Sequence, residues 1–240
     1  MGRICDPMAQ VTPLDRVAVI TLDGLSGSGK STLAKQLAVA LDWSYIDSGA
    51  WYRALTWAVL QSGLAVDDST QVLQVLSQIE LTSDSDGMVV VDKQALRDEL
   101  RTRLIDEHVS AVADHFDVRD ALNGKMRELL ATENVKGVVA DGRDAGTIIF
   151  ANAPLKVFVE VPLEVRAQRR FEQQRKTNPD VTLTQVQSAL SQRDSHDSHR
   201  GSAAPHPTDE SYILDNSNQS VEQAVGRLLT WHQQIFADAK

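Results

Sequence analysis

Residues 24–31 read Gly-Leu-Ser-Gly-Ser-Gly-Lys-Ser, and the class of fold can be predicted from this segment and its neighbours. The segment matches a pattern in which a glycine is followed by any four residues and then by Gly-Lys-Ser. The glycines of this pattern let the backbone wrap around a phosphate and present its N–H groups to it. The stretch follows a short apolar run, residues 17–22, and leads into residues 31–41, where leucines recur every four residues. A buried strand, a glycine loop and an amphipathic helix in this order predict a phosphate-binding loop. The alternative interpretation is a Gly/Ser turn that only begins a helix.

The loop and the first helical turn carry the groups that a nucleotide phosphate requires. The helix N-terminus adds partial positive charge. Lys30 supplies a full charge that can follow a transferring phosphate, and the Ser31 hydroxyl can hold Mg²⁺. The predicted phosphate-binding residues are nine in a row: Gly24, Leu25, Ser26, Gly27, Ser28, Gly29, Lys30, Ser31 and Thr32.

Strand-like and helical segments alternate along the rest of the chain. Strands are predicted at residues 17–22, 44–46, 137–140, 156–161 and 212–214, and helices at 31–41, 50–61 and 221–236. This alternation predicts an α/β fold with a largely parallel sheet. Residues 79–92 instead read as a hairpin with a turn at 84–87, so we expect an inserted subdomain at about 63–105.

Composition and charge exclude several classes of protein. The 240 residues include 24 Lys and Arg against 33 Asp and Glu, for a formal net charge of −9. This balance argues against a nucleic-acid polymer as partner, and no apolar run approaches the roughly 18 residues that a membrane helix needs. The single cysteine, Cys5, cannot form a disulfide within the chain, which is typical of a reducing compartment. We therefore expect a cytoplasmic monomer with no membrane partner.

Two segments after predicted strands carry candidate anion-binding groups. Residues 47–53, Asp-Ser-Gly-Ala-Trp-Tyr-Arg, place Arg53 one turn inside a helix, where it can grip a second anion. Residues 141–147, Asp-Gly-Arg-Asp-Ala-Gly-Thr, follow the third core strand. There Arg143 suits a phosphate, Asp141 can orient magnesium-bound water, and Asp144 can accept a hydrogen bond from the amino group of a base. A surface arginine and a solvated loop are the alternatives.

A third candidate is the basic region near the C-terminal third of the chain. Residues 166–176 contain five basic residues and one acidic residue, and residues 193–200 read Arg-Asp-Ser-His-Asp-Ser-His-Arg. On a helix, Arg193, Asp197 and Arg200 share one face, which can close over two phosphates. A solvated charged face is the alternative, and His196 and His199 are expected to be exposed. Residues 1–15 contain no signal peptide and are expected to form a flexible tail before one domain, residues 16–240.

Together these segments resemble the bacterial cytidylate kinases, a branch of the nucleoside monophosphate kinases. The resemblance rests on residues 24–32, 47–53, 141–147 and 193–200 and on the hairpin insert, and it covers residues 17 to about 231. It implies a P-loop NTPase fold with a five-stranded parallel core, a monophosphate-binding insert and a mobile lid at about 163–178. The implied activity is transfer of the γ-phosphate of ATP to CMP or dCMP with Mg²⁺, in pyrimidine nucleotide metabolism.

The resemblance also implies roles for individual residues. Lys30, Arg143 and Arg193 are the expected catalytic residues, and residues 24–32 the expected ATP site. The expected CMP-binding residues are Ser48, Arg53 and Arg143 at the acceptor phosphate, Ser110, Arg119 and Asp144 at the cytosine, Arg193 and Asp197 at the ribose, and Arg200 at the acceptor pocket. Ser110 and Arg119 come from the resemblance alone, since both look like ordinary helix residues.

One departure from the family pattern concerns the last motif. Family members often carry additional arginine where this chain has His196 and His199, so the charge of the lid near neutral pH is open. Three other functions remain as alternatives: a kinase for a non-nucleotide acceptor such as a small hydroxy acid, a nucleotide-dependent switch, and a structural protein.

Overall fold

A computed structural model describes residues 17–84, 86–131, 135–176 and 178–237. The predicted tail at residues 1–15, Cys5 and one residue of the predicted lid, Thr177, lie outside the described residues.

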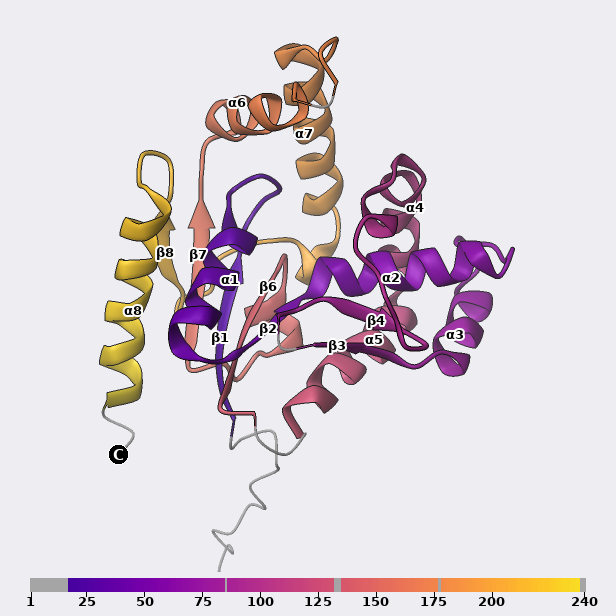
Figure 1. The fold of residues 1–240 in the computed structure, drawn as a ribbon, viewed down its shortest axis with the longest axis horizontal. Coiled ribbons are helices and arrows are strands. Elements are labelled where there is room, and N and C mark those ends of the chain that lie inside the picture. Colours follow the sequence, from indigo (N-terminus) through magenta and orange to yellow (C-terminus); the bar gives the residue numbers. More distant parts are fainter. Residues whose placement is uncertain (1–16, 85, 132–134, 177, 238–240) are drawn as a thin grey trace, which may run out of the picture.

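The centre of the molecule is a five-stranded sheet in the order β2-β6-β1-β7-β8 (Figure 1). Its strands are β1 (Ala18–Asp23), β2 (Ser44–Asp47), β6 (Gly137–Gly142), β7 (Leu155–Glu160) and β8 (Tyr212–Asp215). Every neighbouring pair is parallel. The five predicted strands and the α/β class are therefore confirmed. Central strands that are apolar on both faces indicate a sheet covered by helices on both sides.

Helices cover the two faces of this sheet, and β1 shows how the faces divide. Ile20 and Leu22 pack with α1 (Lys30–Leu41) and α8 (Val221–Ala237), whereas Val19 packs toward α2 (Ser48–Gln61) and α5 (Phe116–Glu128). Successive strand residues point to opposite faces, so one short run serves both cores. The helices predicted at 31–41, 50–61 and 221–236 are confirmed within a few residues.

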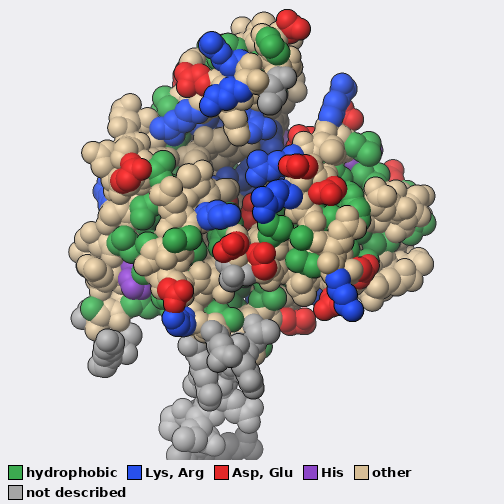
Figure 2. All heavy atoms as spheres, in the orientation of Figure 1, with side chains coloured by type: hydrophobic (Ala, Val, Ile, Leu, Met, Phe, Trp, Pro, Cys, Tyr) green, Lys and Arg blue, Asp and Glu red, His purple; other side chains and the backbone are tan. Residues whose placement is uncertain are grey.

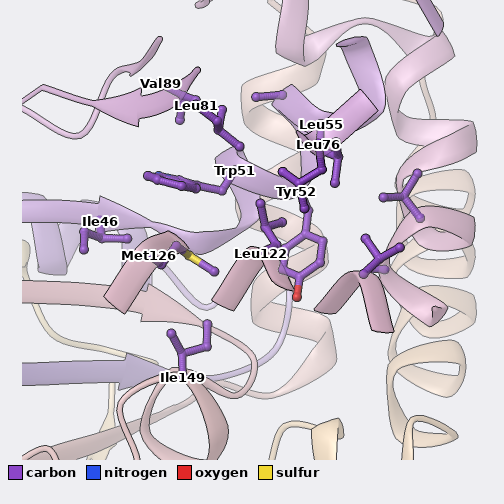
Figure 3. Packing of buried hydrophobic residues seen from close by; sticks show 14 of the residues in the cluster. Ile46, Trp51, Tyr52, Leu55, Leu76, Leu81, Val89, Leu122, Met126 and Ile149 are labelled. Carbon is purple, nitrogen blue, oxygen red and sulfur yellow. The ribbon is translucent and has the colours of Figure 1, made fainter. Parts of the chain in front are cut away.

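Beside α2 lies a second, smaller sheet with its own helices. The elements are α3 (Ser69–Gln78), β3 (Leu81–Ser83), β4 (Val89–Val91), β5 (Gln94–Ala95), a short turn η2 (Glu99–Arg101) and α4 (Arg103–Asp114). Strands β3 and β4 pair antiparallel, which confirms the predicted hairpin; β5, two exposed residues long, was not predicted. Figure 3 shows Leu81 and Val89 packed toward Trp51 and the residues of α2 and α5.

A helical hairpin stands above the carboxyl ends of the main sheet (Figure 1). It consists of α6 (Leu163–Gln174) and α7 (Leu183–Ser198), and contains most of the predicted lid. The hairpin has a separate small core built on Ala167, Val186 and Leu190. Short turns η3 (Leu129–Ala131), η4 (Ala145–Ile149) and η5 (Gly201–Ala203) complete the fold. Among the described residues, no helix is long and apolar enough to cross a membrane.

Candidate nucleotide and acceptor site

The loop between β1 and α1 depends on three glycines with positive φ: Gly24 at 151°, Gly27 at 81° and Gly29 at 86°. A Cβ on Gly24 would lie 2.6 Å from the carbonyl oxygen of Val159, so only glycine fits between the loop and β7. Gly29 is the N-cap residue of α1 and brings no side-chain acceptor to that helix end. The first N–H groups of α1 therefore remain available to an anion, as the sequence predicts.

Two side chains from distant parts of the chain hold the loop in shape. A guanidinium nitrogen of Arg166, on α6, donates to the Ser26 carbonyl at 2.9 Å, and Asn216 Nδ2 donates to the Ser28 carbonyl at 2.9 Å. Arg166 also forms a bidentate pair with Asp194 at 3.2 and 2.7 Å. Arg166 thus supports the loop backbone, and Asn216, which the sequence analysis missed, shares that task.

Lys30 lies inside this loop with only 6% of its surface exposed. Its Nζ donates to the Leu25 carbonyl at 3.2 Å. Burial lowers the pKa of the Lys30 ammonium, nearby Arg143 lowers it further, and Asp141 opposes the change. Ser28 Oγ is buried here without a hydrogen-bond partner in the described part of the chain. Buried polar groups rarely stay unsatisfied, so the loop is shaped for a polar ligand.

Ser31 and Asp141 meet where α1 begins and β6 ends. Ser31 Oγ donates to Asp141 Oδ2 at 2.7 Å, and the Tyr45 hydroxyl donates to Asp141 Oδ1 at 2.5 Å. Burial raises the pKa of Asp141, and the neighbouring Asp47 carboxylate raises it further. Asp141 is the next-to-last residue of β6 rather than the first residue beyond it. Mg²⁺ prefers oxygen ligands and is commonly bound by one or two protein side chains together with phosphate and water. The Ser31 hydroxyl and the Asp141 carboxylate, side by side at the phosphate loop, therefore fit this ion.

Four cations converge beyond the strand ends: Lys30, Arg53, Arg143 and Arg193. Arg193 makes no hydrogen bond or ion pair with any residue that the structure describes. Burial lowers the pKa of Arg193 to about 10, and Arg143 and Arg53 lower it in addition, while Asp197 opposes them. Figure 2 shows Lys and Arg side chains gathered around a hollow on this face. Cations held this close together create a strong field for an anion.

Carboxylates from neighbouring elements hold the other arginines. Asp197, on α7, accepts from Arg143 Nε at 2.9 Å and from Arg200 at 2.9 Å. Burial by itself would raise the pKa of Asp197, but Arg143 and Arg200 outweigh it and hold this pKa below its usual range. Helix α7 ends at Ser198, so Arg200 lies just beyond it, yet it still meets Asp197 as the predicted shared face requires.

The residues expected at a base lie to one side of this cluster. Arg119, on α5, pairs with Asp144, and the two side chains are 12% and 5% exposed. Burial raises the pKa of Asp144 against the pull of Arg119. Ser48 is buried and donates from Oγ to the Asp141 carbonyl at 2.9 Å. Ser110 is half-buried on α4, between Asp106 and Asp114, two carboxylates that pair with Arg53 and Arg200.

A cavity of about 430 Å³ adjoins Arg119 and Arg200 on the outer side of this region, with exposed Phe116 at its wall. His196 and His199 also line it, and both are exposed, as predicted. His196 Nε2 lies 3.2 Å from Asp114 Oδ2, while His199 contacts the Ser195 carbonyl at 2.6 Å through Nδ1.

Asp23 is a further buried carboxylate, to which the sequence pattern gave no role. Its two oxygens accept from the backbone N–H groups of Ala145 at 2.8 Å and Gly146 at 2.7 Å. Burial raises the pKa of Asp23 to about 6. This carboxylate joins the residue before the phosphate loop to the turn that follows Arg143 and Asp144. A lone Asp before a glycine gives no sequence signal for such a contact.

The phosphate loop and the arginines face one another beyond the carboxyl ends of the strands, where open α/β sheets bind their ligands. Proteins built in this way are P-loop phosphotransferases. The family model described as cytidylate kinase matches residues 20–234, so the chain belongs to the cytidylate kinase family.

Individual relatives agree with this assignment. The chain is 36% identical over 215 residues to a cytidylate kinase of Corynebacterium diphtheriae, covering 88% of this chain and 93% of that one. It is 35% identical over 232 residues to a cytidylate kinase of Paraburkholderia phytofirmans, covering 97% and 100%. Among solved structures, TT1252 from Thermus thermophilus has a TM-score of 0.51 at 16% identity, covering 91% of this chain and 97% of that one, which shows a shared fold.

Proposed function

We propose that this chain transfers the γ-phosphate of ATP to CMP or dCMP and so produces ADP with CDP or dCDP. The observation that carries the proposal is a set of four cations, Lys30, Arg53, Arg143 and Arg193. Within this set Arg193 forms no hydrogen bond or ion pair with a described residue, although Asp197 and Asp106 lie near it. An enzyme that binds two phosphate groups in one place needs such a surplus of positive charge. The names of the relatives support the choice of acceptor.

The transfer proceeds in line and without a phospho-enzyme. The attacking atom is a phosphate oxygen of the acceptor, which is ionised at pH 7, so no general base is needed. The protein has to bring two negatively charged groups together and stabilise the charge of the transition state. Lys30 lies at the transferring phosphate, with Arg143 and Arg193 on the acceptor side. Ser31 and Asp141 would hold Mg²⁺, which would supply further neutralisation of the phosphate oxygens.

The acceptor is held by its phosphate, ribose and base. Arg53, Arg143 and Ser48 bind its phosphate, while Arg193 and Asp197 lie at the ribose. The positions of Ser48 directly after β2 and of Arg143 directly after β6 support the phosphate role.

The base is read by a buried polar group rather than by shape alone. Asp144 accepts from the exocyclic amino group of cytosine, with Arg119 and Ser110 beside it and Arg200 at the wall of the acceptor pocket. The burial of the Arg119–Asp144 pair supports this role. The carboxylate and the uracil carbonyl are both hydrogen-bond acceptors, so a buried Asp144 would disfavour uracil.

Closure of the α6–α7 hairpin over the phosphates excludes water and prevents wasteful hydrolysis of ATP. The small separate core of the hairpin supports movement as a unit, and Arg166 couples that movement to the phosphate loop. Since all the proposed ligands come from one chain, a monomer suffices for the reaction.

The direct test is ADP release from Mg-ATP with CMP, dCMP, UMP, AMP, GMP and several alcohols as acceptors. We expect turnover with CMP and dCMP well above the others. Lys30→Ala should lower kcat by about 100-fold or more, because a transition-state contact is lost. Lys35→Ala, at an exposed position of the same helix, should leave kcat unchanged. Turnover with an alcohol in place of CMP, or with no acceptor, would refute the proposal.

A further inference from the structure

Helix α4 presents three polar residues at four-residue spacing: Asp106, Ser110 and Asp114. Residues at this spacing lie along one face of a helix. The face points toward the acceptor region, because its two carboxylates pair with arginines from other elements, Arg53 of α2 and Arg200 beyond α7. Sequence analysis gave neither carboxylate a role.

Asp106 fixes the direction of Arg53. One terminal nitrogen of Arg53 donates to Asp106 Oδ1 at 2.7 Å and the other donates to the Leu100 carbonyl at 3.0 Å. Two bonds on a planar guanidinium define its orientation, which a single bond does not. Asp106 also lies close enough to Arg193 to raise its pKa against the effect of burial, so this carboxylate faces the cation cluster.

Asp114 likewise fixes the direction of the Arg200 guanidinium. Its Oδ1 accepts from Arg200 Nε at 3.0 Å, and Asp197 accepts from Arg200 at 2.9 Å on the other side. The remaining terminal nitrogen of Arg200 has no hydrogen-bond partner in the described part of the chain. The second oxygen of Asp114 lies 3.2 Å from His196 Nε2, which adds a contact to α7.

Stability does not explain these pairs. The Asp106 and Asp114 side chains are 48% and 41% exposed, whereas Arg53 and Arg200 are 20% and 14% exposed, and ion pairs with a solvent-exposed carboxylate contribute little to folding free energy. Orientation is a better explanation, because an arginine held in its binding direction loses less side-chain freedom when a ligand arrives. Carboxylates placed next to the cations of a phosphate site would otherwise only weaken phosphate binding.

We propose that Asp106 and Asp114 are positioning residues: Asp106 holds Arg53 in the direction from which it binds the phosphate of the acceptor, and Asp114 holds Arg200 in its direction at the wall of the acceptor pocket. The inference rests on the proposed function, since it assumes that these arginines meet the acceptor. Neither carboxylate touches the reacting atoms. Their effect is therefore on acceptor affinity and not on the chemical step.

The test is the kinetics of Asp106→Ala and Asp114→Ala with Mg-ATP and CMP. We expect KM for CMP to rise about fivefold for each variant, with kcat and KM for ATP within about twofold of wild type. A partly unfolded enzyme would instead lose kcat at constant KM. Asp114→Asn keeps an oxygen acceptor for Arg200 and should restore most of the affinity. Glu107→Ala is the matched control, because it removes a carboxylate that pairs with exposed Arg103 on the same helix.

An unchanged KM for CMP in both variants would overturn the proposal. A lowered KM would also overturn it and would show that the carboxylates repel the acceptor. Calorimetric titration of the same proteins with inorganic phosphate separates this question from the proposed function. If the wild-type chain does not use CMP, weaker phosphate binding by Asp106→Ala than by Glu107→Ala still supports the positioning of Arg53, and equal binding rejects it.

Discussion

The buried pair between Arg119 and Asp144 allows a prediction about both stability and specificity. We consider Asp144→Asn, which keeps the shape of the side chain and removes its charge. Arg119 retains its hydrogen bond to the Ala113 carbonyl at 3.1 Å and its position 5.6 Å from the centre of the Tyr52 ring. The guanidinium therefore keeps two contacts and exchanges a charged acceptor for a neutral one.

The expected loss of unfolding free energy follows from replacing the charged acceptor by a neutral one. A hydrogen bond to a charged group contributes about 1.5–3 kcal/mol and one between neutral groups about 1 kcal/mol, so the free energy of unfolding should fall by about 1–2 kcal/mol. Urea titration of the ligand-free protein measures this difference. Glu128→Gln, at an exposed position near the end of α5, removes the same charge and should change the free energy of unfolding by less than about 0.5 kcal/mol.

Specificity should change by a comparable amount. The wild-type carboxylate offers uracil only an acceptor, whereas the side-chain amide introduced by Asp144→Asn offers a donor as well. The ratio of kcat/KM for CMP to that for UMP should fall by about 10- to 100-fold, which corresponds to about 1.4–2.7 kcal/mol. A folded Asp144→Asn enzyme with an unchanged ratio would remove Asp144 from base reading. An unchanged free energy of unfolding would refute the argument from the buried pair.

Three further predictions concern the fold, each checked by urea titration. Gly124→Ala adds a Cβ that meets no atom within 4 Å inside α5, so it should stabilise the protein by about 0.5–1 kcal/mol; a loss of stability would contradict the open space seen there. Leu122→Ala removes a side chain that is 0% exposed and should cost about 2–5 kcal/mol, whereas a cost below about 1 kcal/mol would mean that the core collapses into the cavity. Asp23 has its folded-state pKa raised from 3.8 to about 6, so the folded state holds the proton more tightly and this contribution is lost as pH rises. The free energy of unfolding of wild type relative to Asp23→Asn should therefore fall by about 2.4 kcal/mol between pH 4 and pH 7, and a flat difference would refute the raised pKa.

Much of the main sheet was predictable because each strand carries its own signal. A parallel strand buried on both faces reads as a continuous apolar run, as residues 17–20 and 157–159 do. The phosphate loop was predictable for a similar reason, since its glycines, Lys30 and Ser31 lie in one short segment. Strand β5, by contrast, is only two exposed residues long, and its pairing to β4 depends on the hairpin before it.

Residues that act through distant partners were not predictable from local pattern. Arg119 and Asp144 are 25 residues apart, and Asn216 meets Ser28 across 188 residues. Ser110 and Arg119 entered the sequence analysis only through the family resemblance. Asp23 and Asn216 had no such support, although both hold backbone of the site. Contacts of this kind exist only after the sheet has brought its strand ends together.

The contacts of Arg166 and Arg193 show why a high local density of basic residues in the sequence is a poor guide to a phosphate site. Arg166 lies in the most basic segment of the chain, yet its nitrogens are occupied by Asp194 and by the carbonyls of Ser26 and Val161. It is therefore committed to the shape of the loop. Arg193 comes from a segment of mixed charge and forms no hydrogen bond or ion pair with the described residues, although it is partly buried among other cations. Burying a cation costs free energy unless an anion compensates it, so a partly buried arginine without an ion pair indicates an anion-binding site more reliably than a basic segment does.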